Sequence, residues 1–61
     1  MKYRVYLREV IGDYMQEEWT EDYDTPEQAR NRIDTVNEYG KSMRNNVWYM
    51  QAKEQIDEVQ D

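Results

Sequence analysis

The sequence predicts a small α+β fold: a three-stranded antiparallel sheet in the order 2-1-3, with β-β-α-β connectivity and one helix packed on one face. Three observations lead to this prediction. An alternating apolar and polar stretch opens the chain, a segment with clear helix boundaries lies in the middle, and a second alternating stretch follows it. With 61 residues the chain has room for one hydrophobic core, so we expect a single domain over 1–61.

The first strand is expected over residues 2–10. Tyr3, Val5 and Leu7 alternate with charged or polar residues, which places them on one face of a half-buried strand. Gly12 follows directly and can adopt the positive φ that a tight turn requires. We therefore expect the chain to reverse there and form a hairpin.

The second strand is expected over residues 14–23, with Trp19 and Tyr23 on its apolar face. Glu17 and Glu21 interrupt that face, so this strand is weaker than the first. Charged residues on an edge strand discourage pairing with another chain. The second strand is therefore predicted to lie at an edge of the sheet.

The helix is expected over residues 26–39. Thr25 can cap its amino end, Pro26 suits the first helical position, and Gln28 can return the capping hydrogen bond. Gly40 is predicted to end the helix in the left-handed conformation. One face of the helix carries the apolar residues Ala29, Ile33 and Val36.

The third strand is expected over residues 46–52, with one apolar face made of Trp48, Met50 and Ala52. Residues 53–61 allow two interpretations. Ala52, Ile56 and Val59 fit the spacing of a short helix, whereas Glu54 and Ile56 also prolong the alternation of the strand. The pattern alone leaves both open.

One face of this sheet is expected to remain open, because a single helix covers only the other. Alternation places four residues there, Arg4, Tyr6, Arg8 and Tyr49. Tyrosines on such a face pack beneath arginine side chains or in a homodimer interface. With Lys53 they would alternatively form a platform on which the bases of single-stranded nucleic acid stack. The net charge of -6 argues against nucleic acid as the partner.

The acidic residues are unevenly distributed. From Glu9 to Ala29 every charged residue is acidic. One interpretation is a charged hairpin that protects a sheet edge and keeps the chain dissolved. The other is a surface that binds a basic partner by imitating a phosphate backbone. The residues expected to form that surface are Glu17, Glu18, Glu21, Asp22 and Asp24.

The composition argues against most catalytic and metal-binding chemistry. The chain has no histidine and no cysteine, so it offers neither an imidazole base nor a thiol nucleophile. The acidic segment around Asp22 and Asp24 lacks the glycine and the terminal glutamate of an EF-hand loop. We expect no enzyme activity, catalytic residue, metal or cofactor. With no long apolar run and no leader pattern, we expect a cytoplasmic protein without membrane contact.

Two segments carry a resemblance to known proteins: Lys2-Tyr3-Arg4-Val5-Tyr6-Leu7, and the stretch from Trp19 through Thr25-Pro26-Glu27-Gln28 to Ala29. The chain resembles the small acidic orphan proteins of tailed phages and other mobile elements over about two thirds of its length. The resemblance implies a protein that binds and blocks a host factor. It assigns no functional residue.

These observations predict a non-enzymatic protein-binding module that presents an acidic surface to a basic partner, one that normally holds nucleic acid. A homodimeric interaction protein, in which the acidic residues serve only solubility, is the alternative. A single-stranded nucleic-acid binder that uses the open sheet face is the second alternative.

Overall fold

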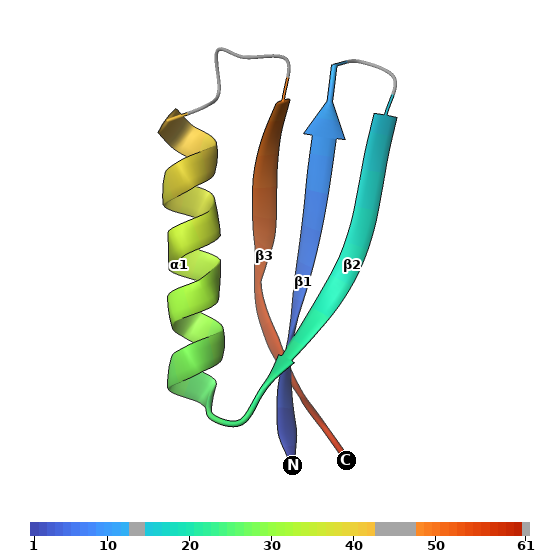
Figure 1. Cartoon of the computed structure of the whole chain (residues 1–61). Helices are drawn as coiled ribbons and strands as arrows, with labels where there is room; N and C mark the ends of the chain where they lie inside the picture. Colours follow the sequence, from blue (N-terminus) through green and yellow to red (C-terminus); the bar gives the residue numbers. More distant parts are fainter. Residues whose placement is uncertain (13–14, 43–47, 61) are drawn as a thin grey trace.

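The computed structural model describes residues 1–12, 15–42 and 48–60 and contains the predicted α+β fold (Figure 1). Its elements are β1 (Lys2–Ile11), β2 (Met15–Tyr23), α1 (Pro26–Ser42) and β3 (Trp48–Val59). The strands form one sheet in the order β2-β1-β3, and β1 is antiparallel to both neighbours. The predicted strand order and the single helix are therefore confirmed.

The core lies between α1 and the central part of the sheet. Its buried members are Val5 and Leu7 from β1, Ala29, Ile33 and Val36 from α1, and Ala52 from β3. Half-buried residues surround it: Tyr3, Trp19, Tyr23, Met50 and Ile56. The side chain of Trp48, which we expected in the core, lies outside the described residues.

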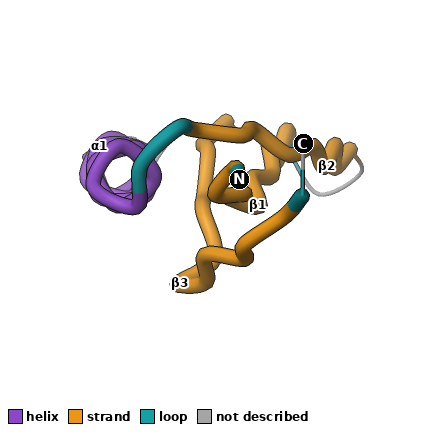
Figure 2. Tube along the Cα trace, turned by 90° about the horizontal axis from the view of Figure 1, so that it is seen from below, coloured by secondary structure: helices purple, strands orange, loops and turns teal. Residues whose placement is uncertain are grey.

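The helix packs mainly along β3, so the two elements lie side by side and β2 forms the far side of the molecule (Figures 1 and 2). We call the face of the sheet toward α1 the helix face and the opposite face the open face. Of the elements that the structure describes, neither another strand nor the helix lies along the outer edge of β2. This position of the helix leaves β2 as the exposed edge strand of the molecule.

The amino end of α1 has the capping arrangement that the sequence predicts. The backbone N–H of Gln28 donates to the Thr25 hydroxyl at 3.2 Å. In return, the side-chain oxygen of Gln28 accepts from the N–H of Thr25 at 3.3 Å and from that of Asp24 at 3.2 Å. Backbone donors that the first turn of a helix leaves unpaired are thereby satisfied.

The carboxyl end of α1 differs from the prediction. The helix continues beyond Tyr39 to Ser42, and Gly40 does not adopt a positive φ; among the described residues only Gly12 does, at 60°. The predicted left-handed cap at Gly40 is therefore wrong. The structure gives this glycine a different role: a Cβ atom there would overlap the backbone carbonyl of Met50 on β3. Gly40 lets the helix approach the strand closely.

The third strand is longer than predicted. It reaches Val59, so the ambiguous segment 53–61 continues the strand through most of its length and is not a helix. The register to β1 shifts between Val5 and Leu7, where residues 53–55 lie opposite Tyr6 alone. This bulge holds two extra residues, and because the alternation repeats every two residues it returns Ile56 to the face of Ala52.

Candidate functional site

Strand alternation divides the predicted acidic surface between the two faces of the sheet. In β2, Glu17 and Glu21 lie on the helix face, whereas Glu18 and Asp22 lie on the open face. Asp24 follows the end of the strand. The structure therefore does not bring these five carboxylates together on one face. What they share is a position on β2, the edge strand, or directly after it.

Glu21 is held by three neighbours on the helix face. It accepts hydrogen bonds from Arg32 at 2.8 and 3.3 Å, from the Tyr23 hydroxyl at 2.6 Å and from the Trp19 indole N–H at 3.2 Å. Burial alone would raise the pKa of Glu21, but these hydrogen bonds outweigh it and hold the pKa below its usual value. Glu21 thus links β2 to α1 and is a structural residue.

Asp22 and Asp24 are also neutralised within the chain. Arg4 donates two hydrogen bonds to Asp22, at 2.8 and 3.0 Å, and Lys2 forms an ion pair with Asp24. The hydrogen bond from Arg4 lowers the pKa of Asp22, and the one from Lys2 lowers the pKa of Asp24. Both carboxylates stay ionised near neutral pH, but their charge is largely balanced by a basic residue of β1.

Glu17 and Glu18 are the two members of the predicted surface whose charge is not balanced. In the described part of the chain neither has an ion pair. Glu17 lies directly opposite Glu9 on β1, and like charges in such a pair destabilise a sheet. Among the described residues of the hairpin, the uncompensated negative charge is therefore concentrated at Glu9, Glu17 and Glu18.

The residues predicted for the open face carry polar contacts that span the sheet. Besides the pair of Arg4 and Asp22, the Tyr6 hydroxyl donates to Asp57, which is the main reason that the pKa of Tyr6 is raised. The Arg8 guanidinium donates to the Gln51 side-chain oxygen at 2.9 and 2.5 Å.

Tyr49 is half-buried and lies opposite Val10 near the hairpin end of the same face. Val10 is 9% exposed although it stands apart from the main core. The two residues give the open face a small apolar region beside its polar contacts.

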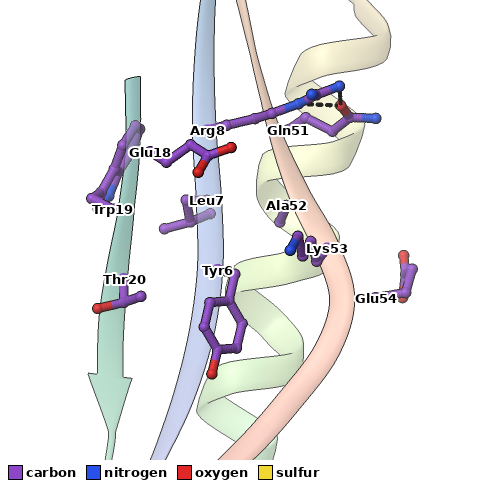
Figure 3. A pocket seen from close by; sticks show the side chains of 10 residues that line it. All are labelled: Tyr6, Leu7, Arg8, Glu18, Trp19, Thr20, Gln51, Ala52, Lys53 and Glu54. Atoms are coloured by element: carbon purple, nitrogen blue, oxygen red, sulfur yellow. Dashed lines mark hydrogen bonds between the residues drawn. The ribbon is translucent and has the colours of Figure 1, made fainter. Parts of the chain in front are cut away.

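A hollow of about 520 Å³ lies on the open face between the three strands (Figure 3). Its polar and charged lining residues are Tyr6, Arg8, Glu18, Thr20, Gln51, Lys53 and Glu54, of which Glu54 is paired with Arg30 of the helix. The Lys53 amine stands 5.7 Å from the centre of the Tyr6 ring, a cation–π distance. Lys53 reaches this position because Ala52 pairs with Leu7, so the next residue of β3 lies opposite Tyr6, where the bulge begins.

Several residues that shape this region were not predicted as site residues. Arg32, Gln51 and Asp57 each bind a residue that was predicted. Arg32 directly precedes the buried Ile33, so a long side chain at the border of the apolar helix face was a usable signal. Gln51 and Asp57 depend on the register of β3 and its bulge, for which the sequence holds no local signal.

The described residues offer no metal centre, since no group of three or more carboxylates among residues 1–12, 15–42 and 48–60 is arranged to hold an ion. No polar or charged side chain in that part of the chain is fully buried. The helix of the described structure is neither long nor apolar enough to cross a membrane.

Comparison with known proteins identifies no relative. No protein-family model matches the chain, and no curated protein and no solved structure is similar to it. A functional assignment must therefore come from the site itself.

Proposed function

We propose that the chain is a non-enzymatic protein-binding module whose edge strand β2 binds an extended, basic segment of a partner protein. The observation that carries this proposal is an edge strand of nine residues that bears no basic residue and has no other strand of the described chain on its outer side. An edge strand presents unpaired backbone N–H and C=O groups. Addition of a partner strand to such an edge is a recurring mode of peptide recognition.

The division of the carboxylates between two faces fits binding at an edge. A flat partner surface could reach Glu17 or Glu18, but not both, because consecutive residues of a strand point to opposite faces. A strand lying alongside β2 places its own side chains on both faces. Adjacent basic residues in that strand would meet Glu17 on one face and Glu18 on the other, as cross-strand ion pairs.

The charge of β2 also selects the kind of strand that can pair with it. Two copies of β2 side by side would bring glutamates and aspartates against one another, which is unfavourable. The same charges that protect the edge against self-pairing and acidic strands would attract a basic strand and speed its encounter. A protein surface that normally holds nucleic acid has this basic character, and blocking it is the activity that we propose.

The carboxylates with the clearest role in the fold do not support catalysis. A general acid at neutral pH needs a raised pKa, and the carboxyl groups of Glu21, Asp22, Asp24 and Asp57 all have lowered pKa values. Ion pairs and hydrogen bonds within the fold hold them there. This is the pattern of structural charges and supports a binding role.

The test uses a short threonine-valine peptide with adjacent central lysines and a matched peptide with glutamates in their place. We expect the lysine peptide to bind and its affinity to fall as salt is added, because exposed charges are screened within about 10 Å at 0.1 M salt. The glutamate peptide should not bind. Isothermal titration calorimetry measures both.

The variant Glu17→Gln/Glu18→Gln should weaken binding of the lysine peptide about five-fold, on the scale of exposed ion pairs. Its thermal stability should stay the same or rise slightly, since the repulsion between Glu9 and Glu17 is relieved. Glu27→Gln/Glu58→Gln is the matched control: it removes the same charge from exposed sites outside β2. Equal affinity of the two variants would show that β2 is not the binding site.

A further inference from the structure

The open face contains charges that the rest of the fold leaves unbalanced. Of the basic residues whose side chains the structure describes, Lys2, Arg4, Arg30 and Arg32 each have a carboxylate partner. The other two are Arg8 and Lys53, and both line the hollow. In a chain with a net charge of -6, basic residues without a carboxylate are the exception.

A carboxylate without a basic partner borders the same hollow. Glu18 lies opposite Arg8 in the register of β1 and β2, and such neighbours commonly form an ion pair. Here the guanidinium turns to the other strand and binds Gln51, as Figure 3 shows. The face therefore presents both an acid on β2 and bases on β1 and β3 that are available to an outside molecule.

The bulge in β3 is part of this arrangement. Bulges change the direction of side chains and often occur next to binding sites. Lys53 is the first residue of this bulge, and its amine stands over the ring of Tyr6 on the open face.

We infer that the open face binds a second copy of the chain, and that Glu18 of each copy enters the hollow of the other and pairs with its Lys53. A two-fold axis along β1 places β2 of one copy over β3 of the other. Glu18 and Gln51 lie at the same height along the strands, because both are opposite Arg8. Lys53 is the next residue of β3 on the open face. The same contact forms twice, as two-fold symmetry requires.

A second copy suits this face in charge, and the size of the face limits how tightly that copy can bind. The unbalanced acid lies on β2, whereas Lys53 lies on β3 and the Arg8 guanidinium turns from β1 toward Gln51 of β3. Rotation about an axis along β1 therefore brings acid over base. Three strands at a spacing of about 4.8 Å and about ten residues long give the open face an area of about 500 Å². A stable interface buries about 800 Å² per partner, so the dimer is expected to be weak and sensitive to salt, with a dissociation constant of about 0.1 mM.

Sedimentation velocity over about 10 μM to 1 mM measures the association. The variants Glu18→Lys and Lys53→Glu should each weaken it at least ten-fold, about the factor expected when an attractive pair becomes repulsive. Mixing the two variants in equal amounts should restore a dimer, because each reversed charge then meets its opposite. Circular dichroism and thermal melting establish that both variants fold.

Glu58→Lys is the matched control, since it makes the same change at an exposed position of β3 outside the open face. Both lysine substitutions make the chain less acidic, so a general charge effect would strengthen association in both. The inferred contact predicts the opposite for Glu18→Lys. A wild-type chain that stays monomeric at 1 mM, or a dimer that Glu18→Lys and Lys53→Glu leave unchanged, would overturn the inference.

This inference goes beyond the proposed function and can fail separately from it. Lys53 is not on β2, so Lys53→Glu should disrupt the dimer and leave binding of the lysine peptide intact. Glu17 belongs to the β2 edge that is proposed to bind the peptide, so Glu17→Gln should weaken peptide binding. Because Glu17 lies on the helix face, away from the dimer contact, the same variant should leave the dimer intact.

Discussion

Gly40 illustrates how one missing side chain fixes the distance between two elements. The helix crosses β3 so closely at this point that a Cβ atom would overlap the Met50 carbonyl, which is backbone and cannot rotate away. In an exposed helix, replacing glycine by alanine stabilises by up to about 1 kcal/mol. At Gly40 the steric overlap should instead make the replacement by alanine destabilising.

We therefore expect Gly40→Ala to lower the free energy of unfolding by about 1–3 kcal/mol, the usual cost of overpacking. Asn31→Ala, at an exposed position of the same helix, should be neutral or slightly stabilising. Urea denaturation followed by circular dichroism measures both. If Gly40→Ala proved more stable than the wild type, α1 and β3 would have to be farther apart than described.

Thr25 carries a second prediction at the same scale. Its hydroxyl accepts from the N–H of Gln28, so Thr25→Ala leaves a helix donor without its partner. We expect a loss of about 1 kcal/mol in the free energy of unfolding. Thr35→Ala, on the exposed side of the helix interior, is the control and should not destabilise. Equal denaturation midpoints for the two variants would mean that the cap does not stabilise α1.

These two residues also mark what the sequence could predict. The cap of Thr25 and Gln28 is a local pattern in which residues three apart contact each other, so the sequence contains the whole interaction. Gly40 meets a strand ten residues further along the chain. Its local context fits a helix cap, and only the packing of α1 on β3 reveals the steric role.

At the scale of elements, β3 shows the same limit. Ala52, Ile56 and Val59 fit a helical spacing, whereas the alternation of a strand places Ala52 and Ile56 on one face and Val59 on the other. Pairing with β1 over the whole length of β3 decides in favour of the strand. The fold class and strand order were predictable from alternation and chain reversal, whereas the bulge opposite Tyr6, which sets Ile56 opposite Val5, was not.

The link between β2 and α1 predicts how stability depends on pH. The pKa of Glu21 is lowered in the folded chain, so its ion pair with Arg32 contributes fully above the unfolded value of about 4.3 and is lost as the pH falls through the lower folded value. Asp22 and Asp24 act in the same direction, below about 3.9. The melting temperature should therefore fall below about pH 4.

Thermal denaturation between neutral and acid pH at constant salt checks this prediction. Arg32→Gln should lower the melting temperature at neutral pH and make the decrease in acid smaller, because the ion pair is already gone. Arg30→Gln removes an exposed pair with Asp34 and Glu54 and should leave the acid decrease unchanged. A melting temperature that rises on acidification would mean that relief of the net negative charge outweighs these ion pairs.

At the scale of the whole molecule, the distribution of charge and the position of the helix point to the same edge. Basic residues of β1 and α1 balance Glu21, Asp22 and Asp24, which leaves Glu17 and Glu18 as the uncompensated charges of β2. The helix lies along β3, so the β2 edge has no cover. The acidic run in the sequence thus separates into residues that hold the fold together and residues that are free to meet a partner.

The most direct test is amide hydrogen exchange, resolved by residue, with and without the lysine peptide. In an edge strand every second N–H points outward, so we predict that alternate amides of β2 become protected when the peptide binds, while the protection of β1 stays the same. Protection that appears instead on β3 or α1, or binding with no change at β2, would contradict the account.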